Sequence, residues 1–266
     1  MPNPTQPLLR IDDVSVRFGG IAALDGVSFD VQAGQICGLI GPNGAGKSSL
    51  FNCLSRLYSC DSGAIEFDGH NLLALPRHRM AAIGIGRTFQ NLALFNTMSV
   101  LDNVLVGCHA RHHAGILRNA FRLPGTRGVE AAAREQANTL IEFLSLEGVA
   151  SRAVGSLPFG TQKRVELARA LAAKPKLLLL DEPACGLNHE EMASLGSLVL
   201  DVRRRFDVTV LLVEHHMSLV MGISDKVVAL NFGRKLAEGT PAEVGTHPEV
   251  IKAYLGTDGA ELDPTA

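Results

Sequence analysis

A glycine-rich stretch between two apolar segments constrains the fold of this chain more than any other feature. Residues 41–48 read Gly-Pro-Asn-Gly-Ala-Gly-Lys-Ser, which fits the pattern GxxxxGK[ST]. The apolar run Ile36–Ile40 precedes it, and a helical stretch follows from Lys47 to about Leu57. Strand, glycine-rich loop and helix in this order are typical of a phosphate-binding loop. An ordinary glycine-rich turn is the alternative, and the flanking elements argue against it.

The residue types of this stretch suit a nucleoside triphosphate. Glycines let backbone N–H groups turn toward the α- and β-phosphates, and the following helix presents its positive N-terminus to them. Lys47 is expected to neutralise oxygens of the β- and γ-phosphates, and Ser48 to coordinate Mg²⁺. The residues predicted to contact ATP here are Gly41, Pro42, Asn43, Gly44, Ala45, Gly46, Lys47, Ser48 and Ser49.

A second candidate site lies at the end of the apolar run Leu177–Leu180, which is followed by two carboxylates. A strand that ends beside a phosphate loop is where Mg²⁺ has to be held. Asp181 is expected to orient the metal, and Glu182 to polarise the attacking water as a general base. Taken alone, such a pair is usually a strand end that meets solvent, so the interpretation depends on the loop upstream.

The rest of the pattern indicates an α/β protein with a helical insertion. Two short apolar runs between Leu8 and Val31 are separated by glycines, which suits a small antiparallel β layer. From Ser99 to Leu146 the apolar residues recur at helical spacing. From Leu177 onward strands and helices alternate again. We therefore predict a helical block inserted in an α/β core.

Composition excludes several classes of function. The 25 basic and 27 acidic residues give a net charge of −2, so we expect no nucleic-acid partner. The sequence shows no apolar run of about 18 residues and no signal-peptide pattern at its start, which predicts a cytoplasmic chain without a membrane span. The five cysteines are odd in number and lack CxxC spacing, which indicates reduced thiols.

The order of further motifs resembles the ATPases of ABC transporters over almost the whole chain. Gln90 in Arg-Thr-Phe-Gln follows the phosphate loop, and Leu-Pro-Phe-Gly-Thr-Gln at 157–162 precedes the two carboxylates. Gly-Leu-Asn at 186–188 has the position of the D-loop, and His215 that of the switch histidine. Phe18 falls where an aromatic ring stacks on adenine in this family.

The resemblance implies a P-loop NTPase (RecA-like) core with an N-terminal antiparallel β layer and an inserted α-helical subdomain. We expect a single ABC ATPase domain over residues 7–256, with the helical subdomain at about 91–160 and a disordered tail at 257–266. Gln90 is expected to sense the γ-phosphate and to hold Mg²⁺ together with Ser48 and Asp181. His215 is expected to act on the γ-phosphate side of the water, beside Glu182 and Lys47.

The resemblance also implies partners. ATP would lie between the phosphate loop of one ATPase subunit and the signature loop of a second, with Phe159, Gly160 and Thr161 as its contacts in that loop. The second ATPase subunit is expected to be a different chain. Two transmembrane permease subunits and a solute-binding protein complete such an importer. This chain is expected at the cytoplasmic face of the inner membrane as a peripheral subunit.

Within the family, several stretches look most like branched-chain amino acid importers. These are Gly-Ile-Gly-Arg-Thr-Phe-Gln-Asn at 84–91, the residues 182–188, Ala-Glu-Gly-Thr-Pro at 237–241, and Tyr-Leu-Gly at 254–256. Close relatives handle urea, amides or lipopolysaccharide, so those cargoes stay open. A soluble ABC ATPase is a lesser alternative, because such proteins usually carry two cassettes or large inserted arms.

The signature loop departs from the family. Leu-Ser-Gly-Gly-Gln is replaced by Leu157-Pro158-Phe159-Gly160-Thr161, so the serine hydroxyl that binds the γ-phosphate is missing. A proline is tolerated at a helix entry, and the helix that follows still directs its N–H groups at phosphate. The change raises the alternative of a weakly hydrolysing scaffold. Against it argue the intact residues Lys47, Asp181, Glu182 and His215. His216 stands where relatives often carry Asp, and the sequence assigns it no role.

Overall fold

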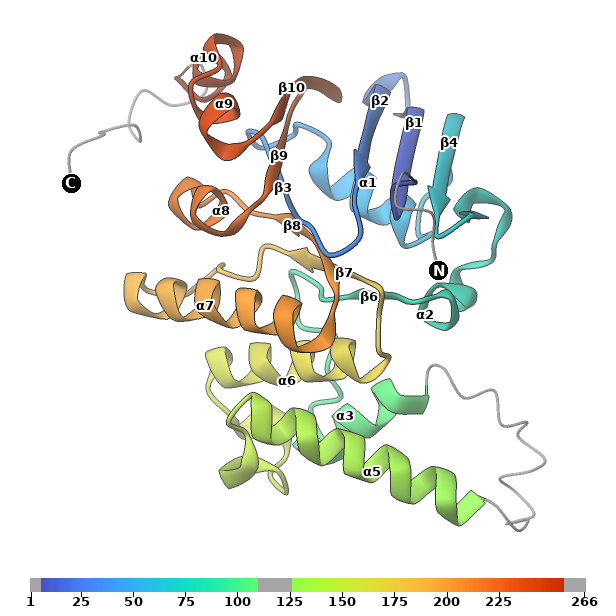
Figure 1. Ribbon diagram of the computed structural model, residues 1–266, viewed down its shortest axis with the longest axis vertical. Coiled ribbons are helices and arrows are strands. Elements are labelled where there is room, and N and C mark those ends of the chain that lie inside the picture. Colours follow the sequence, from blue (N-terminus) through green and yellow to red (C-terminus); the bar gives the residue numbers. More distant parts are fainter. Residues whose placement is uncertain (1–5, 110–125, 256–266) are drawn as a thin grey trace. The chain divides into compact units, whose positions relative to one another are not determined.

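The computed structural model describes residues 6–109 and 126–255 and divides into two compact units (Figure 1). Unit 1 comprises Met1–Met80 together with Leu179–Ala266, and unit 2 comprises Ala81–Leu178. The predicted tail at 257–266 lies outside the described residues. Each unit is taken in turn below.

Unit 1 begins with an antiparallel sheet. Strands β1 (Leu9–Phe18) and β2 (Ile21–Val31) pair with each other, and β4 (Ser62–Phe67) and β5 (His70–Asn71) extend the sheet in the order β2-β1-β4-β5. Apolar residues of β1 at near-alternate positions are buried, which is typical of a sheet with one covered face. The predicted antiparallel β layer is confirmed.

The second sheet of unit 1 is built around β3 (Ile36–Ile40), which runs parallel to both of its neighbours, β8 (Thr209–Val213) and β9 (Lys226–Asn231). Strand β10 (Arg234–Gly239) pairs antiparallel with β9, and β7 (Leu177–Asp181) lies beside β8. Every residue of β3, β7 and β8 is buried, which explains why these strands are continuous apolar runs.

Helices of unit 1 follow the strands in the way that the alternating pattern predicts. They are α1 (Lys47–Leu54), α7 (His189–Phe206), α8 (Met217–Ile223), α9 (Pro241–Gly245) and α10 (Pro248–Leu255), with single 3₁₀ turns at η1 (Leu72–Ala74) and η2 (Arg77–Arg79). The helix predicted to reach Leu57 ends at Leu54. Arg56 takes a positive φ of 58°, and the N–H groups of Leu57 and Tyr58 both donate to the carbonyl of Asn52, which closes the helix.

Unit 2 is mainly helical, and α3, α5 and α6 pack together in it (Figure 1). Its elements are α2 (Met80–Ile83), β6 (Ile85–Arg87), α3 (Val100–His109), α5 (Thr126–Phe143), η3 (Glu147–Val149), η4 (Val154–Ser156) and α6 (Phe159–Ala172). The buried face of α5 carries Ala133, Ala137, Leu140 and Ile141. In the sequence these apolar residues recur at helical spacing, which is the pattern that predicted a helix here.

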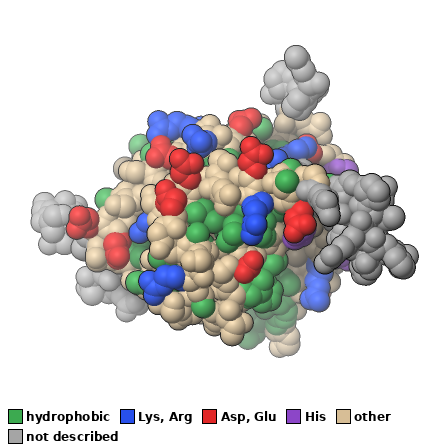
Figure 2. All heavy atoms as spheres, turned by 90° about the horizontal axis from the view of Figure 1, so that it is seen from below, with side chains coloured by type: hydrophobic (Ala, Val, Ile, Leu, Met, Phe, Trp, Pro, Cys, Tyr) green, Lys and Arg blue, Asp and Glu red, His purple; other side chains and the backbone are tan. Residues whose placement is uncertain are grey.

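Among the residues that the structure describes, no helix combines the length and apolarity needed to cross a bilayer. Figure 2 shows one face of the molecule, on which acidic and basic side chains are interspersed around apolar ones. The surface charge on that face is therefore mixed.

Candidate nucleotide-binding site

The glycine-rich loop joins β3 to α1, as the sequence predicts. Its backbone lies so close to neighbouring strands that two positions admit only glycine. A Cβ on Gly41 would stand 2.2 Å from the carbonyl oxygen of Leu230, and one on Gly46 would stand 2.5 Å from that of Ala23. Both glycines also have positive φ, 150° and 102°. The loop can therefore pack closely against β2 and β9 only because these two positions carry no side chain.

Lys47 opens α1 and turns its amine back over the loop. Its Nζ donates hydrogen bonds to the carbonyl oxygens of Gly41 at 2.5 Å and Pro42 at 3.0 Å, and the residue is only 6% exposed. Burial lowers the pKa of Lys47, while the nearby Glu182 carboxylate acts in the opposite direction. An ammonium group has three donors, so one remains for an anion above the loop.

An aromatic pair lies at the end of β1. Phe18, predicted to stack on adenine, is 47% exposed, and its ring meets that of Tyr58 edge to face with centroids 5.1 Å apart. Tyr58 follows α1, to which its backbone N–H is hydrogen-bonded through Asn52. The sequence analysis missed Tyr58, because nothing in its spacing links it to Phe18. Apolar ring surface at this place suits a planar base.

The two carboxylates lie at the end of β7 and just beyond it. Asp181 is buried, at 7% exposure, and closes the strand. Glu182 has a positive φ of 47°, which is uncommon for a residue with a side chain, and its N–H donates to the carbonyl of Val213 at 2.9 Å. Such strained positions cluster at functional sites.

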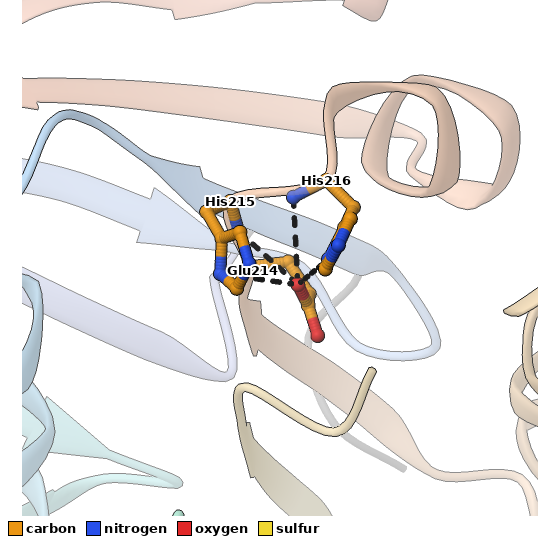
Figure 3. A group of neighbouring side chains, drawn as sticks. All are labelled: Glu214, His215 and His216. Carbon is orange, nitrogen blue, oxygen red and sulfur yellow. Dashed lines mark hydrogen bonds and ion pairs between the residues drawn. The ribbon is translucent and has the colours of Figure 1, made fainter. Parts of the chain in front are cut away.

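His215 and His216 follow β8 and meet at a buried glutamate (Figure 3). Oε2 of Glu214 accepts the backbone N–H of His215 at 3.1 Å and lies 3.1 Å from Nδ1 of His216. The two imidazole rings lie against each other, with centroids 4.1 Å apart. His215 keeps 49% of its side chain exposed. The sequence analysis did not single out Glu214, since a glutamate that ends a strand is usually solvated.

In unit 2, Gln90 lies in the segment after β6. The backbone N–H groups of Phe89 and Ala93, on either side of Gln90, both donate to Oε1 of Glu166 at 3.2 Å. Arg169 donates to the carbonyl of Ala93 at 2.5 Å. Both side chains come from α6, so the signature helix and the Gln90 segment are tied to each other.

The signature residues Phe159, Gly160 and Thr161 form the first turn of α6. Pro158 occupies the N-cap and provides no side-chain hydrogen bond. The amide nitrogen Nε2 of Gln162 donates to the carbonyl of Leu157 at 2.9 Å, and Lys163 Nζ lies 5.1 Å from the centre of the Phe159 ring. Phe159 itself is 47% exposed. The turn is therefore open at its N-terminal end.

The predicted site residues divide between the two units. Phe18, the loop at 41–49, Asp181, Glu182 and His215 belong to unit 1, whereas Gln90 and 159–161 belong to unit 2. For Mg²⁺, the Ser48 hydroxyl and the Asp181 carboxylate fit by the chemistry of their donors, because hard divalent cations prefer oxygen ligands.

A glycine-rich loop between a central parallel strand and a helix defines the class of P-loop nucleoside triphosphatases. The chain belongs to the ABC transporter family, whose model matches residues 24–185. A second family model, described as branched-chain amino acid ATP-binding cassette transporter, matches residues 234–260.

Individual relatives agree with this assignment. The chain is 43% identical over 252 residues to the high-affinity branched-chain amino acid transport ATP-binding protein BraF of Pseudomonas aeruginosa, covering 95% of this chain and 99% of that protein. LivG of Escherichia coli K12, which carries the same description, is 40% identical over the same length with the same coverage. The fold class predicted from the sequence is confirmed by these relatives and by solved structures.

Among the solved structures, the ADP conformation of MJ1267, an ATP-binding cassette of an ABC transporter, superposes with a TM-score of 0.82 at 31% identity, covering 95% of this chain and all of that one. A nucleotide-free ATP-binding cassette from an ABC transporter gives a TM-score of 0.80 at 30% identity, with 94% and 99% coverage.

Proposed function

We propose that this chain is the ATP-binding and ATP-hydrolysing subunit of an importer for branched-chain amino acids, peripheral at the cytoplasmic face of the inner membrane. The observation that carries the proposal is the similarity to BraF and LivG over 95% of the chain, together with the family match at 234–260. Two permease subunits, a second and different ATPase chain and a solute-binding protein are its proposed partners.

In the proposed reaction the backbone N–H groups of the phosphate loop hold the α- and β-phosphates, and Lys47 neutralises oxygens of the β- and γ-phosphates. Ser48, Gln90 and Asp181 would hold Mg²⁺, which would supply charge neutralisation on the phosphate oxygens. Glu182 orients and polarises the attacking water, and His215 contacts the γ-phosphate side of that water. Phe18, with Tyr58 beside it, stacks on the adenine.

The second ATPase chain has a defined place in the proposal. The signature turn at 159–161 contacts the nucleotide of the other subunit. The N–H groups of Phe159 and Gly160 are the proposed donors, since that of Thr161 is bonded to the carbonyl of Pro158 at 3.0 Å, and the exposure of Phe159 supports this assignment. ATP bound by both subunits would close the pair, and hydrolysis would open it again.

The direct test is uptake of radiolabelled leucine in cells whose only copy of this chain is wild type or Lys47→Ala. Loss of uptake at equal protein level and equal membrane association supports the proposal, because Lys47 is the cation proposed to hold the phosphates of ATP. Arg204→Ala, which removes an exposed cation on α7, is the control and should leave uptake unchanged. Unchanged uptake in Lys47→Ala would exclude leucine as the principal cargo and direct the search to urea, amides or lipopolysaccharide.

A further inference from the structure

Glu214 is a fully buried carboxylate to which the proposed reaction gives no role. Its exposed fraction is 0%, and it lies between the end of β8 and His215. A carboxylate is seldom buried so completely unless it is paired or hydrogen-bonded. Its contacts therefore indicate what holds it there.

The carboxylate oxygens of Glu214 are the acceptors of three backbone hydrogen bonds. Oε1 accepts the backbone N–H of Ala184 at 2.6 Å. Oε2 accepts the backbone N–H groups of His215 at 3.1 Å and His216 at 3.5 Å, and also faces Nδ1 of His216 at 3.1 Å. Figure 3 shows the contacts from both histidines converging on that one oxygen. Nδ1 of His216 thus faces the same carboxylate oxygen as two backbone N–H groups.

The bond to Ala184 connects Glu214 to the segment that carries Glu182. A second bond runs in parallel, from the N–H of Glu182 to the carbonyl of Val213 at 2.9 Å. Two consecutive residues, 213 and 214, thus hold the turn 182–184 in place. That turn contains the positive φ of Glu182, a conformation that persists only where surrounding bonds maintain it.

The bond to His216 connects Glu214 to the side chain of His215. With Nδ1 fixed on Oε2, the ring of His216 lies against that of His215 at an interplanar angle of 39°. His216 is partly buried, whereas His215 is half exposed. The His216 ring is therefore a fixed surface that restricts the orientations open to His215.

A metal ion is the competing explanation for this cluster. Glu214, His215 and His216 could offer one ligand atom each, all within 4.8 Å of one another. However, both oxygens of Glu214 already face N–H groups, which present positive charge where a cation would have to bind. The hydrogen bonds favour a positioning role over a metal site.

We propose that Glu214 is a positioning residue for ATP hydrolysis, which fixes the backbone that carries Glu182 through Ala184 and the orientation of His215 through His216. The inference rests on the proposed function, since it assigns Glu214 to the reaction proposed for that site. The same arrangement gives His216 a role, because its ring links the Glu214 carboxylate to the side chain of His215.

The test is Glu214→Gln in the full chain, assayed alone for nucleotide binding and in the assembled transporter for hydrolysis. Glutamine keeps the size of the side chain but turns one terminal oxygen into an N–H donor, which must then face Ala184 or the histidines. We expect kcat to fall on the order of ten- to a hundredfold. The KM for ATP and the affinity for a non-hydrolysable ATP analogue should change little, because none of the hydrogen bonds of Glu214 goes to the phosphate loop.

The matched control is Glu243→Gln. Glu243 also accepts a backbone N–H through its carboxylate, from Thr240 at 2.8 Å, but it caps α9 rather than the catalytic turn. It should leave kcat unchanged. An unchanged kcat in Glu214→Gln, or an equal loss in both variants, would overturn the proposal.

Amide hydrogen exchange of the full chain without nucleotide gives a second readout that needs no hydrolysis. In Glu214→Gln the amides of Ala184, His215 and His216 should exchange faster, while those of the phosphate loop should not change. Retained protection at these three amides would contradict the positioning role. If the wild-type complex proves unable to hydrolyse ATP, the proposed function fails, whereas the exchange result still decides whether Glu214 holds the turn.

If Glu214→Gln does not fold, His216→Phe replaces it, since this variant keeps a ring beside His215 but removes the donor at Nδ1. A kcat reduced severalfold at unchanged nucleotide affinity supports the link through His216. Wild-type kcat in that variant would overturn it.

Discussion

The phosphate loop and the signature turn each lie at the N-terminus of a helix where a phosphate is expected, but they differ in packing and exposure. The phosphate loop before α1 is packed so closely that Gly41 and Gly46 have no room for a Cβ, and Lys47 is buried against its carbonyl groups. The signature turn at the start of α6 exposes Phe159 and has a proline in place of a capping side chain. The first loop is held by contacts within this chain, whereas the second is exposed at Phe159, where we propose that it meets the nucleotide of another subunit.

A second contrast concerns two buried glutamates that hold backbone segments near these loops. Glu214 in unit 1 accepts three backbone N–H groups and faces an imidazole nitrogen. Glu166 in unit 2 accepts two N–H groups at 3.2 Å, with Arg169 at 4.0 Å. The segment around Gln90 is thus held by the same kind of contact, but with two backbone N–H groups instead of three.

The largest effect is expected from Glu182→Gln, which removes the proposed general base that follows β7 near Lys47 of the phosphate loop. Turnover of the assembled transporter should fall by about 10²- to 10⁴-fold, with ATP retained on the protein. Phosphate release and nucleotide retention on a filter measure the two quantities. Glu142→Gln, which changes an exposed carboxylate on α5, is the control. Normal phosphate release in Glu182→Gln would show that Glu182 of unit 1 is not the general base of ATP hydrolysis.

An intermediate effect, in the opposite direction, is expected from Pro158→Ser, which restores a capping hydroxyl to the signature turn. A hydrogen bond to a charged group contributes about 1.5 to 3 kcal/mol, so a gain of roughly tenfold in turnover corresponds to the lower end of that range. Pro158→Ala removes the ring without adding a hydroxyl and should give no gain. Equal ATPase activity in the serine variant and wild type would show that the missing hydroxyl is not what limits the site.

The smallest effect is expected from Glu166→Gln, where we predict about a twofold to fivefold loss of turnover, less than for Glu214→Gln. Burial raises the pKa of Glu166 above its ordinary 4.5, and the amides of Ala93 and Phe89 and then Arg169 oppose the rise. A raised carboxylate pKa contributes stability that is fully present below the unfolded value and is lost as the pH rises through the folded value. The free energy of unfolding of wild type relative to Glu166→Gln should therefore decrease as the pH is raised from 4 toward neutrality. Denaturant titrations at several pH values measure this, and a difference that increases with pH would contradict the assignment.

Much of this architecture could be predicted from local sequence, and the rest depends on contacts between distant residues. The phosphate loop, the strand that ends at Asp181 and the buried face of α5 each follow from a pattern within a few residues. Glu214 and Glu166 escaped prediction because each binds amides far along the chain: that of Ala184 lies 30 residues from Glu214, and those of Phe89 and Ala93 lie about 75 residues from Glu166. Tyr58 was missed for the same reason, since its partner Phe18 lies far back in the chain, at the end of β1.

We propose that the phosphate loop of this chain binds ATP without a contribution from the chain's own signature turn, which acts on a partner's nucleotide. The measurement that tests it most directly is the affinity of the isolated full chain for ATP in wild type, Lys47→Ala and the double variant Phe159→Ala/Thr161→Ala. We predict at least about a tenfold loss of affinity for Lys47→Ala, equivalent to about 1.4 kcal/mol, and wild-type affinity for the double variant, whose assembled transporter should nevertheless turn over more slowly. A comparable loss of affinity in both variants would contradict the claim, because the signature turn would then bind the same nucleotide as the phosphate loop of its own chain.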